Sequence, residues 1–377
     1  MAVFQAHRPL ASPVSGPHDH AGGYPASSLK ARHPGCNFHQ DFSVARLVEP
    51  LTIPQEAKER LRILFIAKHA LWSGGLHPED GNHAVYHQEV RTILEELGLN
   101  LTLANSFDAL IKDPDVDFVF PLLNRAGFVN SEMLGPLLCN MHRIAYLGAS
   151  PIVRGLSDDK HLSKLVAERA GVPTAPWTCY RRGAPVDEAD CPRAERLVIK
   201  PNASSASWGV QDAHDWAGVV NAVADIHGQG HDAIVEPFLN GSDVEVPVLT
   251  VGDPIVMPML IFQQADPTHL RTYYEKRDLV GRAHKYSLDP FDDEEWVPKI
   301  AELTHKLFRE FRPFDYGRFE FRLDRETGDV QFLEVNLNCN LWSEKVFGRA
   351  AALAGLTQAE LIETILADSL RRNGLIG

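Results

Sequence analysis

Apolar and polar positions follow two different periods along the first half of the chain. The apolar run LRILFIA (61–67) predicts a buried strand, and HAVYHQEVRTILEELG (83–98) has the spacing of an amphipathic helix that ends at Gly98. The same reasoning predicts short strands at 99–104, 117–123 and 143–148 and a helix at 132–142. Strands that alternate with helices are typical of a parallel sheet covered on both faces. We therefore expect an α/β domain at 58–155.

The pattern changes after this first domain. A helix is predicted at 157–171, with Ser157 as N-cap and Gly171 as its stop, and the segment 240–262 predicts an antiparallel hairpin that turns at VGDP. Further predicted elements are strands at 196–201 and 233–239, helices at about 215–226, 296–311 and 350–372, and a polar loop at 202–210. Antiparallel strands mixed with helices predict an α+β arrangement for this part of the chain.

The first 57 residues differ from the rest in composition. They are rich in Pro, Gly, Ser and Ala, and they contain five of the 17 histidines, at positions 7, 18, 20, 33 and 39. The histidines could form a metal-binding tract, but their spacing matches no zinc or helical pattern. We interpret residues 1–57 as an extension without a metal site.

Composition narrows the class of protein. The net charge of −13 argues against a nucleic-acid-binding surface, although it does not exclude an anionic substrate. The five cysteines are odd in number and form no CxxC pair, which suits free thiols in a reducing compartment. No apolar run reaches the roughly 18 residues of a membrane span, and no signal-peptide core is present. We expect a cytoplasmic protein that does not enter a membrane.

A hairpin at 317–336 carries the most informative chemistry. Its first strand alternates apolar and charged residues, with Phe319, Phe321 and Leu323 against Arg318, Glu320 and Arg322. If ETG (326–328) is a three-residue loop with Gly328 in the left-handed conformation, Arg325 lies opposite Asp329. Counting back then places Glu320 opposite Glu334, and such cross-strand neighbours are ~5 Å apart.

A facing pair of carboxylates needs a cation or a shared proton. Asn336 adds a neutral oxygen on the face of Glu334, since side chains two apart in a strand point the same way. Three hard oxygen ligands suit Mg²⁺ or Mn²⁺. Two alternatives stay open: Arg318 and Arg322 could neutralise both glutamates on a solvated face, or a loop register different by one residue could separate the carboxylates.

Other candidate residues are each weak signals by themselves. Lys200 ends a predicted strand before a loop of small residues whose N–H groups could approach phosphate oxygens. The remaining candidates are acids that follow strands and cations that could equally be solvated: Glu236, Asp243, Lys160, Lys276 and Arg277.

The order of these motifs resembles the ATP-grasp superfamily, and most of all its D-alanine–D-alanine ligase branch. The resemblance covers roughly residues 61–372. It implies an ATP-grasp fold, in which the N-terminal α/β domain is followed by two α+β subdomains that clasp ATP, here at 156–235 and 236–377.

Residue by residue, the resemblance also implies a nucleotide site. Lys160 matches the first nucleotide-binding lysine, near the α-phosphate, and Lys200 matches the second. The other implied nucleotide contacts are Ser207 and Gly209 on the loop over the β- and γ-phosphates, Glu236 with the backbone of Phe238 and Leu239 at the adenine, and Asp243 at the ribose.

The resemblance implies catalytic residues and metal ligands as well. Lys276 matches the lysine that contacts the γ-phosphate, and Arg318 matches the arginine that stabilises the tetrahedral intermediate. Glu320, Glu334 and Asn336 match the ligands of two Mg²⁺ (or Mn²⁺) ions, in agreement with the hairpin count. The expected reaction joins a carboxylate to an amine through an acylphosphate, and Cys339 only lines the site.

The substrate side departs from the D-alanine ligases. Residues 124–128 (NRAGF) stand where the ligases have a His-Gly pair, and their paired serines and Lys-Tyr read Ala206–Ser207 and Lys276–Arg277. In the tail LNCNLWSEK (337–345), Lys345 replaces a serine that holds the acceptor carboxylate. Lys345, Arg277 and Asn340 are therefore our candidate substrate contacts, although Lys345 could equally be a surface residue.

We expect an ATP-grasp carboxylate–amine ligase that acts on amino-acid-like small molecules in specialised metabolite biosynthesis. The alternatives are D-alanine–D-alanine ligase itself and a catalytically inactive ATP-binding regulatory protein; the intact charged hairpin disfavours the second. The expected partners are small-molecule carboxylates and amines, not nucleic acid or membrane, and a homodimer stays open.

Overall fold

The computed structural model describes residues 48–75, 77–78, 83–123, 131–276 and 285–377. The histidines of the N-terminal extension, the NRAGF segment and Arg277 lie outside the described residues.

The first sheet is parallel, with strand order β2-β1-β3-β4. Its elements are α1 (Gln55–Arg60), β1 (Arg62–Ala67), α2 (His83–Glu96), β2 (Asn100–Ala104), α3 (Asp108–Ile111), β3 (Phe118–Leu122), η1 (Ser131–Met133), α4 (Leu134–His142) and β4 (Ala145–Tyr146). Ile63 and Phe65 pack on one face in a core shared with α2, whereas Leu64 and Ile66 pack on the other with Cys139 of α4. The predicted parallel sheet with two covered faces is confirmed.

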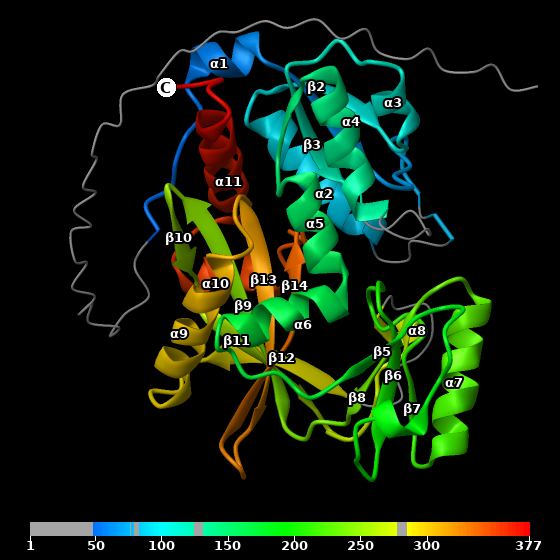
Figure 1. Ribbon diagram of the computed structural model, residues 1–377. Coiled ribbons are helices and arrows are strands. Elements are labelled where there is room, and N and C mark those ends of the chain that lie inside the picture. The colour runs from blue at the N-terminus through cyan, green and yellow to red at the C-terminus, as the bar shows by residue number, and fades with distance from the viewer. Residues whose placement is uncertain (1–47, 76, 79–82, 124–130, 277–284) are drawn as a thin grey trace, which may run out of the picture. The chain divides into compact units, whose positions relative to one another are not determined.

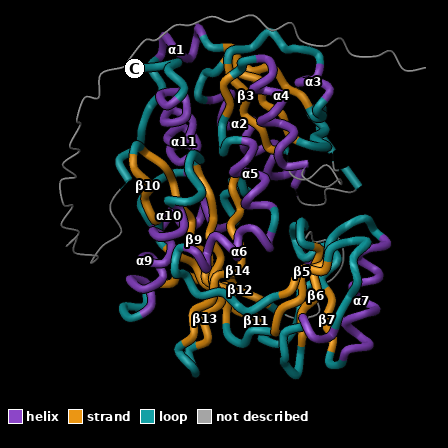
Figure 2. Tube along the Cα trace, viewed as in Figure 1, coloured by secondary structure: helices purple, strands orange, loops and turns teal. Residues whose placement is uncertain are grey.

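A small antiparallel sheet follows, with strand order β5-β8-β6-β7. Its elements are β5 (Thr178–Tyr180), η2 (Glu188–Asp190), β6 (Leu197–Pro201), β7 (Gln211–Ala213), α7 (Trp216–Gly228) and β8 (Ala233–Pro237). Helix α7 lies along this sheet (Figures 1 and 2) and buries Val219, Val223 and Ile226 against it. The loop that leaves β6 is thereby held at the end of a firmly packed strand.

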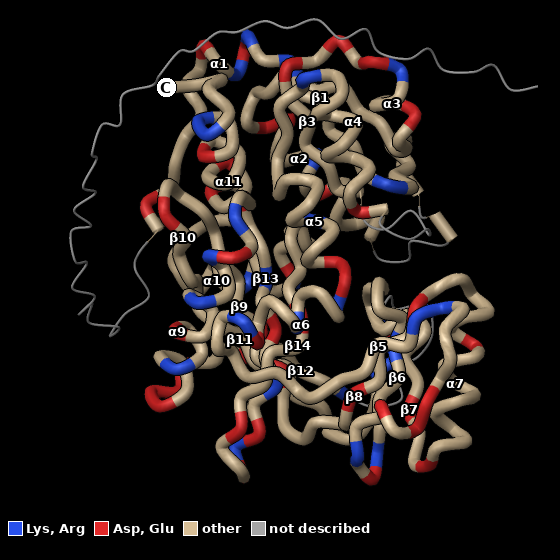
Figure 3. The backbone as a smooth tube through the Cα atoms, in the orientation of Figure 1, with Lys and Arg blue, Asp and Glu red and all other residues tan. Residues whose placement is uncertain are grey.

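The largest sheet in the described part of the chain has six strands, ordered β12-β11-β9-β13-β14 with β10 paired to β9. Its elements are β9 (Ser242–Val251), β10 (Asp253–Val256), β11 (Met259–Gln264), α8 (Tyr273–Lys276), β12 (Tyr286–Phe291), α9 (Trp296–Phe308), β13 (Tyr316–Asp324) and β14 (Asp329–Leu337). One face is apolar and packs on α9, through Val244, Val246, Phe319 and Phe321 among others. The alternate residues are charged, as the mixed colours along β13 show (Figure 3), and they form the opposite face.

Two helices connect the first sheet to the rest, and two end the chain. They are α5 (Pro151–Asp158), α6 (Lys160–Arg169), α10 (Val346–Leu353) and α11 (Gln358–Arg372). Although α11 comes last in sequence, its Leu361 and Ile365 share a core with Phe65 of β1. Among the described residues no single helix has the length and hydropathy of a membrane span, and α10 with α11 passes that test only as a pair bent by 103°.

The capping of α6 corrects one expectation. Ser157 is not its N-cap, because that residue still belongs to α5, where its hydroxyl donates to the carbonyl of Arg154 (2.9 Å). The cap is Asp159, whose backbone is extended and whose carboxylate accepts from the N–H of Leu162 (2.8 Å). Lys160 is therefore the first residue of α6.

The hairpin between β13 and β14 corrects a second expectation. Asp324, not Arg325, lies opposite Asp329, so the loop is one residue longer than predicted. A register shift between Glu320 and Phe321 compensates, and Glu320 faces Glu334 as predicted. The extra residue of this bulge is Leu333, since Phe332 still faces Phe321.

The thiols agree with the prediction as far as the described residues extend. Cys139, Cys179, Cys191 and Cys339 are free. Cys36 lies outside those residues.

Candidate active site

The charged face of the large sheet forms the floor of a cleft with a volume of about 620 Å³. Its walls come from the start of α6, the loop after β6, the end of α8 and the segment after β14. A second pocket of about 170 Å³ shares Lys160, Lys276 and Asp243 with the cleft and extends to Lys200 and Phe238. Nearly all of the described candidate residues therefore border one continuous region.

Three glutamates lie side by side across adjacent strands on the floor of the cleft. Glu245 of β9 pairs with Glu320 of β13, which pairs with Glu334 of β14. Glu320 and Glu334 are predicted from the sequence, whereas Glu245 was not among the predicted site residues. The signal was present, because Asp243 and Glu245 are two apart in a predicted strand and so share a face.

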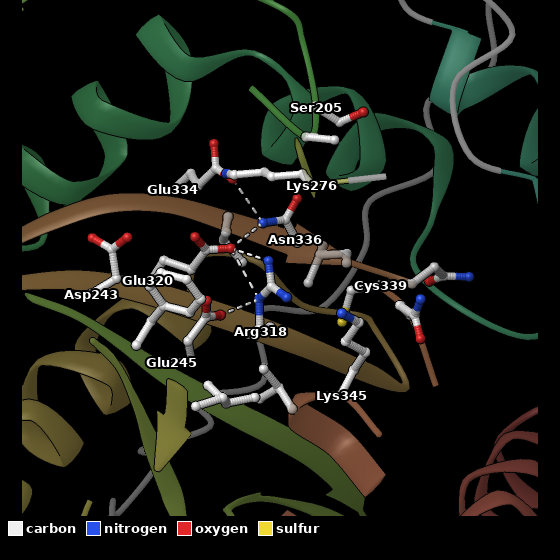
Figure 4. A pocket seen from close by; sticks show the side chains of 18 of the residues that line it. Ser205, Asp243, Glu245, Lys276, Arg318, Glu320, Glu334, Asn336, Cys339 and Lys345 are labelled. Atoms are coloured by element: carbon white, nitrogen blue, oxygen red, sulfur yellow. Dashed lines mark hydrogen bonds and ion pairs between the residues drawn. The ribbon is translucent and has the colours of Figure 1, made fainter. Parts of the chain in front are cut away.

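Arg318 lies among these carboxylates (Figure 4). Its Nε is 2.7 Å from Oε2 of Glu245, and the guanidinium also donates to Oε1 of Glu320, from Nε at 3.0 Å. Despite its burial, these two carboxylates hold the pKa of Arg318 well above its usual range. The arginine is thus a permanent cation in the middle of the cleft.

Asn336 bridges the two glutamates predicted as metal ligands. Its Nδ2 donates to Oε1 of Glu320 (2.7 Å) and to Oε1 of Glu334 (3.0 Å). Rotation of the amide by half a turn would present Oδ1 beside both carboxylates, which gives three hard oxygen donors. No three His, Cys, Asp or Glu side chains of the described residues form a metal centre by themselves, so the Asn336 oxygen is needed for the set that suits Mg²⁺.

The protonation of the two glutamates differs. Burial and the nearby carboxylates of Glu245 and Glu334 raise the pKa of Glu320 to about 8, although Arg318 opposes them. Burial also acts to raise the pKa of Glu334, but Lys160 and the Asn336 amide hold it at about 2. Around Glu320 the carboxylate groups outnumber the nearby positive charges. A divalent cation bound there would relieve the repulsion between these carboxylates.

Two of the predicted phosphate-binding lysines lie in the cleft. Lys160 is buried, donates from Nζ to the carbonyl of Ser204 (2.7 Å) and lies 3.5 Å from Oε2 of Glu334. It is therefore not the solvated residue that its sequence position allowed. Lys276 ends α8 and lines both the cleft and the second pocket, and burial lowers its pKa.

Lys200 and Glu236 belong to a buried ion cluster. Glu236 contacts Lys200 and lies 3.2 Å from Nζ of Lys164, which the sequence analysis missed. Burial disfavours the charged carboxylate, yet the two lysines hold the pKa of Glu236 at about 2. Lys164 gave no sequence signal, because it meets Glu236 of β8 only in the folded chain.

The expected adenine and ribose residues are tied together by Arg322, which was considered above as a counter-ion of the glutamates but pairs with Asp243. It donates from Nη1 to Oδ1 of Asp243 (2.7 Å) and from Nε to the carbonyl of Leu239 (3.0 Å). Its partner strand, β9, brings Asp243 opposite Arg322 in register. The Phe238–Leu239 backbone and Asp243 are thereby held in a defined relation to each other.

The loop after β6 has an unusual backbone. Ala206, Ser207 and Gly209 all have positive φ, at 53°, 58° and 70°. Only glycine fits at position 209, because a Cβ there would lie 2.7 Å from the ring of Pro201. The loop also carries a serine pair, Ser204 and Ser205, which precedes the pair considered in the sequence analysis and lines the cleft.

Two of the three predicted substrate contacts, Lys345 and Asn340, line the cleft, and Lys345 lies away from Asp243 and Glu334 (Figure 4). Lys345 is half-buried and lines the cleft, with Nζ 5.5 Å from the ring centre of Trp342. Asn340 also lines it, but its Oδ1 accepts from the N–H of Trp342 (2.6 Å). Burial raises the pKa of the lining thiol Cys339 to about 12, so this thiol stays neutral.

Arg154, also missed from the sequence, fixes the chain at this end. It is buried, donates to the carbonyl of Leu337 and pairs with Glu132. Asn338, which follows Leu337, has a φ of 60°, and its side-chain amide donates to the carbonyl of Leu147 (3.2 Å). These contacts hold the segment after β14 against the first domain.

Comparison with known proteins agrees with this geometry. The family described as "D-ala D-ala ligase C-terminus" matches residues 166–367, more than half of the chain. The chain belongs to the D-alanine–D-alanine ligase family. The family match covers the small sheet, the large sheet and the row of glutamates.

Individual relatives of this family align over most of their length. The uncharacterized protein y4sG of Sinorhizobium fredii is 30% identical over 247 residues, which are 64% of this chain and 72% of that protein. The D-alanine–D-alanine ligase of Acetivibrio thermocellus is 25% identical over 69% of this chain and 70% of its own length.

A solved structure shares the fold. The D-alanine–D-alanine ligase from Bacillus anthracis complexed with ATP has a TM-score of 0.65 and 17% sequence identity, and the alignment covers 83% of this chain and 99% of that one. The predicted α/β ATP-grasp fold is confirmed, and the protein is an ATP-grasp ligase of the class that forms carbon–nitrogen bonds.

Proposed function

We propose that the protein joins the carboxylate of one amino-acid-like molecule to the amine of another, with ATP converted to ADP and phosphate. The observation that carries this proposal is the convergence of Lys160, Lys276, Arg318 and the Glu320–Glu334–Asn336 set on one cleft. A solved relative in this family is described as complexed with ATP. The three expected segments, 58–155, 156–235 and 236–377, would then act as the domains that enclose the substrates.

In this proposal the second pocket holds the nucleoside. Adenine lies along the Phe238–Leu239 backbone, ribose hydroxyls donate to Asp243, and the triphosphate runs into the cleft. Lys160 and Lys200 contact the phosphates. The N–H groups of the loop at Ser207 and Gly209, where φ is positive, donate to the phosphate oxygens. Lys276 lies at the γ-phosphate end, because it borders both pockets.

The reaction has two steps. A carboxylate oxygen of the first substrate attacks the γ-phosphorus, and the bond to the ADP oxygen breaks, which leaves an acylphosphate. The amine of the second substrate then attacks the acyl carbon, phosphate leaves with the bonding electron pair, and the nitrogen loses a proton. Arg318 donates to the oxyanion of the tetrahedral intermediate, an interaction worth roughly 3–4 kcal/mol.

The residues around Glu320 fit a divalent cation. The chemistry that Mg²⁺ (or Mn²⁺) supplies there is neutralisation of charge on the phosphate oxygens. The Asn336 amide donates to both Glu320 and Glu334, so the two strands hold the three proposed ligand side chains close together.

The acceptor differs from D-alanine in this proposal. Lys345 borders the cleft and has no carboxylate partner among the described residues, so an acceptor with an additional acidic or polar group suits it. Such a substrate fits specialised metabolite biosynthesis in a reducing cytoplasm. D-alanine–D-alanine ligation is the second candidate, because many relatives carry that name.

Phosphate release with pairs of amino acids tests the proposal. We expect release with a pair that contains an acidic acceptor, dependence on ATP and Mg²⁺, and none in Arg318→Met. Release with D-alanine alone would instead support the second candidate. Absence of release and of ligated product with all pairs, while ATP binds, would contradict ligase activity on amino acids.

A further inference from the structure

Arg271 lines the cleft but has no role in the proposed reaction. It lies between β11 and α8, and its guanidinium carbon is 3.5 Å from the ring centre of Phe262 and 5.4 Å from that of Tyr286. The two rings stack on each other with centres 4.7 Å apart. An aromatic support of this kind fixes the plane of the guanidinium while leaving its N–H edge free.

The two arginines on the charged face of the large sheet both have carboxylate partners. Arg318 pairs with Glu245 and Arg322 pairs with Asp243. In the part of the chain that the structure describes, Arg271 makes no hydrogen bond or ion pair, and burial lowers its pKa. A desolvated cation without an anion is costly, so this position favours an anionic ligand.

A second cation borders the same space. Lys276 also lines the cleft. Its pKa is lowered first by burial and second by the positive charge of Arg271. The acids that act on both cations are Asp243 and Glu320, the proposed ribose and metal residues. Arg271 and Lys276 thus line the same cleft as the proposed ribose acid and the proposed metal ligand.

We propose that Arg271 binds phosphate oxygens of the nucleotide, as a cation additional to Lys160, Lys200 and Lys276. The inference rests on the proposed course of the triphosphate from Asp243 to Glu320. A planar guanidinium held by Phe262 can donate two parallel hydrogen bonds to a phosphate, and the phosphate charge removes the repulsion between Arg271 and Lys276. The substrate cation Lys345 lies toward the other end of the cleft (Figure 4).

Calorimetry with the full chain in the presence of Mg²⁺ tests this assignment. The ligands are a non-hydrolysable ATP analogue, ADP and adenosine, and the variants are Arg271→Met, which keeps an apolar side chain on Phe262, and Arg271→Lys. We expect Arg271→Met to weaken the ATP analogue roughly 10- to 100-fold, ADP less, and adenosine not at all. Arg271→Lys should recover part of the loss.

A matched control is Arg325→Met. Arg325 lies 5.6 Å from the ring centre of Phe291 and pairs with Asp293 (3.0 Å), but does not border the cleft. This variant should bind all three ligands as the wild type does.

Two results would overturn the assignment of Arg271: equal losses for adenosine and the ATP analogue, and unchanged affinity for every nucleotide. Because no amino-acid substrate is needed for binding, failure here with normal wild-type binding leaves the proposed ligation standing. Failure of the wild type to bind the ATP analogue would overturn both.

Discussion

The two ends of the cleft differ in how their charges are balanced. At the nucleotide end Glu236 is buried between two lysines, and Asp243 pairs with Arg322. At the substrate end Lys345 lies over an aromatic ring and has no carboxylate partner among the described residues. Around the proposed adenine and ribose positions the charges thus compensate one another, whereas Arg271 is left for the phosphates. In the described part of the chain, the proposed substrate end has no such compensated pair at Lys345, and it is where the sequence predicts a departure from the D-alanine ligases.

The proposed metal site lies between these two proposed ends, and its loss should have the largest effect. In Glu334→Gln the side chain keeps its shape but loses the anionic oxygen that, with Glu320 and Asn336, would hold a cation. We expect turnover to fall roughly 10³-fold, because charge neutralisation on the phosphates is worth several kcal/mol. Phosphate release measured over a Mg²⁺ titration is the test, and unchanged thermal unfolding is its control. Near-normal turnover at ordinary Mg²⁺ would contradict the metal assignment.

The compensation at the nucleotide end can be broken at its acid. Glu236→Gln leaves Lys164 and Lys200 buried without their carboxylate partner, so we expect the free energy of unfolding to fall by about 3 kcal/mol. Denaturant unfolding measures it. The control is Glu302→Gln, which removes a surface ion pair with Lys306. If Glu236→Gln lowers the free energy of unfolding by less than this control does, the buried cluster adds no stability.

Glu245 tests whether Arg318 needs a second carboxylate. When a cation engages Glu320, Glu245 is left as the partner that keeps the guanidinium in place, at 2.7 Å from Nε. Glu245→Gln should therefore lower the turnover number roughly tenfold, because the ion pair that positions Arg318 loses its negative charge. The Michaelis constant for ATP should stay unchanged. An equal change in both constants would indicate a general distortion of the cleft and not a loss of Arg318 positioning.

The comparison also explains what could be predicted from the sequence. Alternation along single strands predicted which residues of β13 and β14 face the cleft, because side-chain direction is a local property. The register between the two strands was harder to predict, because it depends on the length of the loop and on bulges. The loop was one residue longer than expected, and only the bulge at Leu333 restored the pairing of Glu320 with Glu334. The prediction of that pair was correct although its count was wrong.

Charge partners were the part that sequence reasoning could not reach. Lys164, Arg322 and Glu245 each find their counter-ion on another strand or helix, far away in the chain. Which of many lysines and glutamates meet depends on packing between elements, and motifs find only those that the family resemblance already marks. The prediction of the N-cap of α6 was wrong for a local reason. Both Ser157 and Asp159 are residue types that cap helices, but Ser157 lies within α5, so Asp159 is the cap.

The smallest expected effect is the one that decides what the substrate end does. If Lys345 faces an acidic group of the acceptor, Lys345→Ser should raise the Michaelis constant for that acceptor about fivefold, since a half-buried ion pair exceeds the ~0–1 kcal/mol of a surface pair. The Michaelis constant for ATP should not change, because Lys345 lies away from the nucleotide end. Lys299→Ser is the matched control: Lys299 also stacks on a tryptophan, 4.1 Å from the ring centre of Trp296, but it lies outside the cleft. Lys345→Ser could instead change the Michaelis constants of both substrates equally, or change them no more than the control does. Either result would mean that Lys345 only covers Trp342. The unpaired charge of Lys345 would then have no effect on which acceptor the enzyme selects.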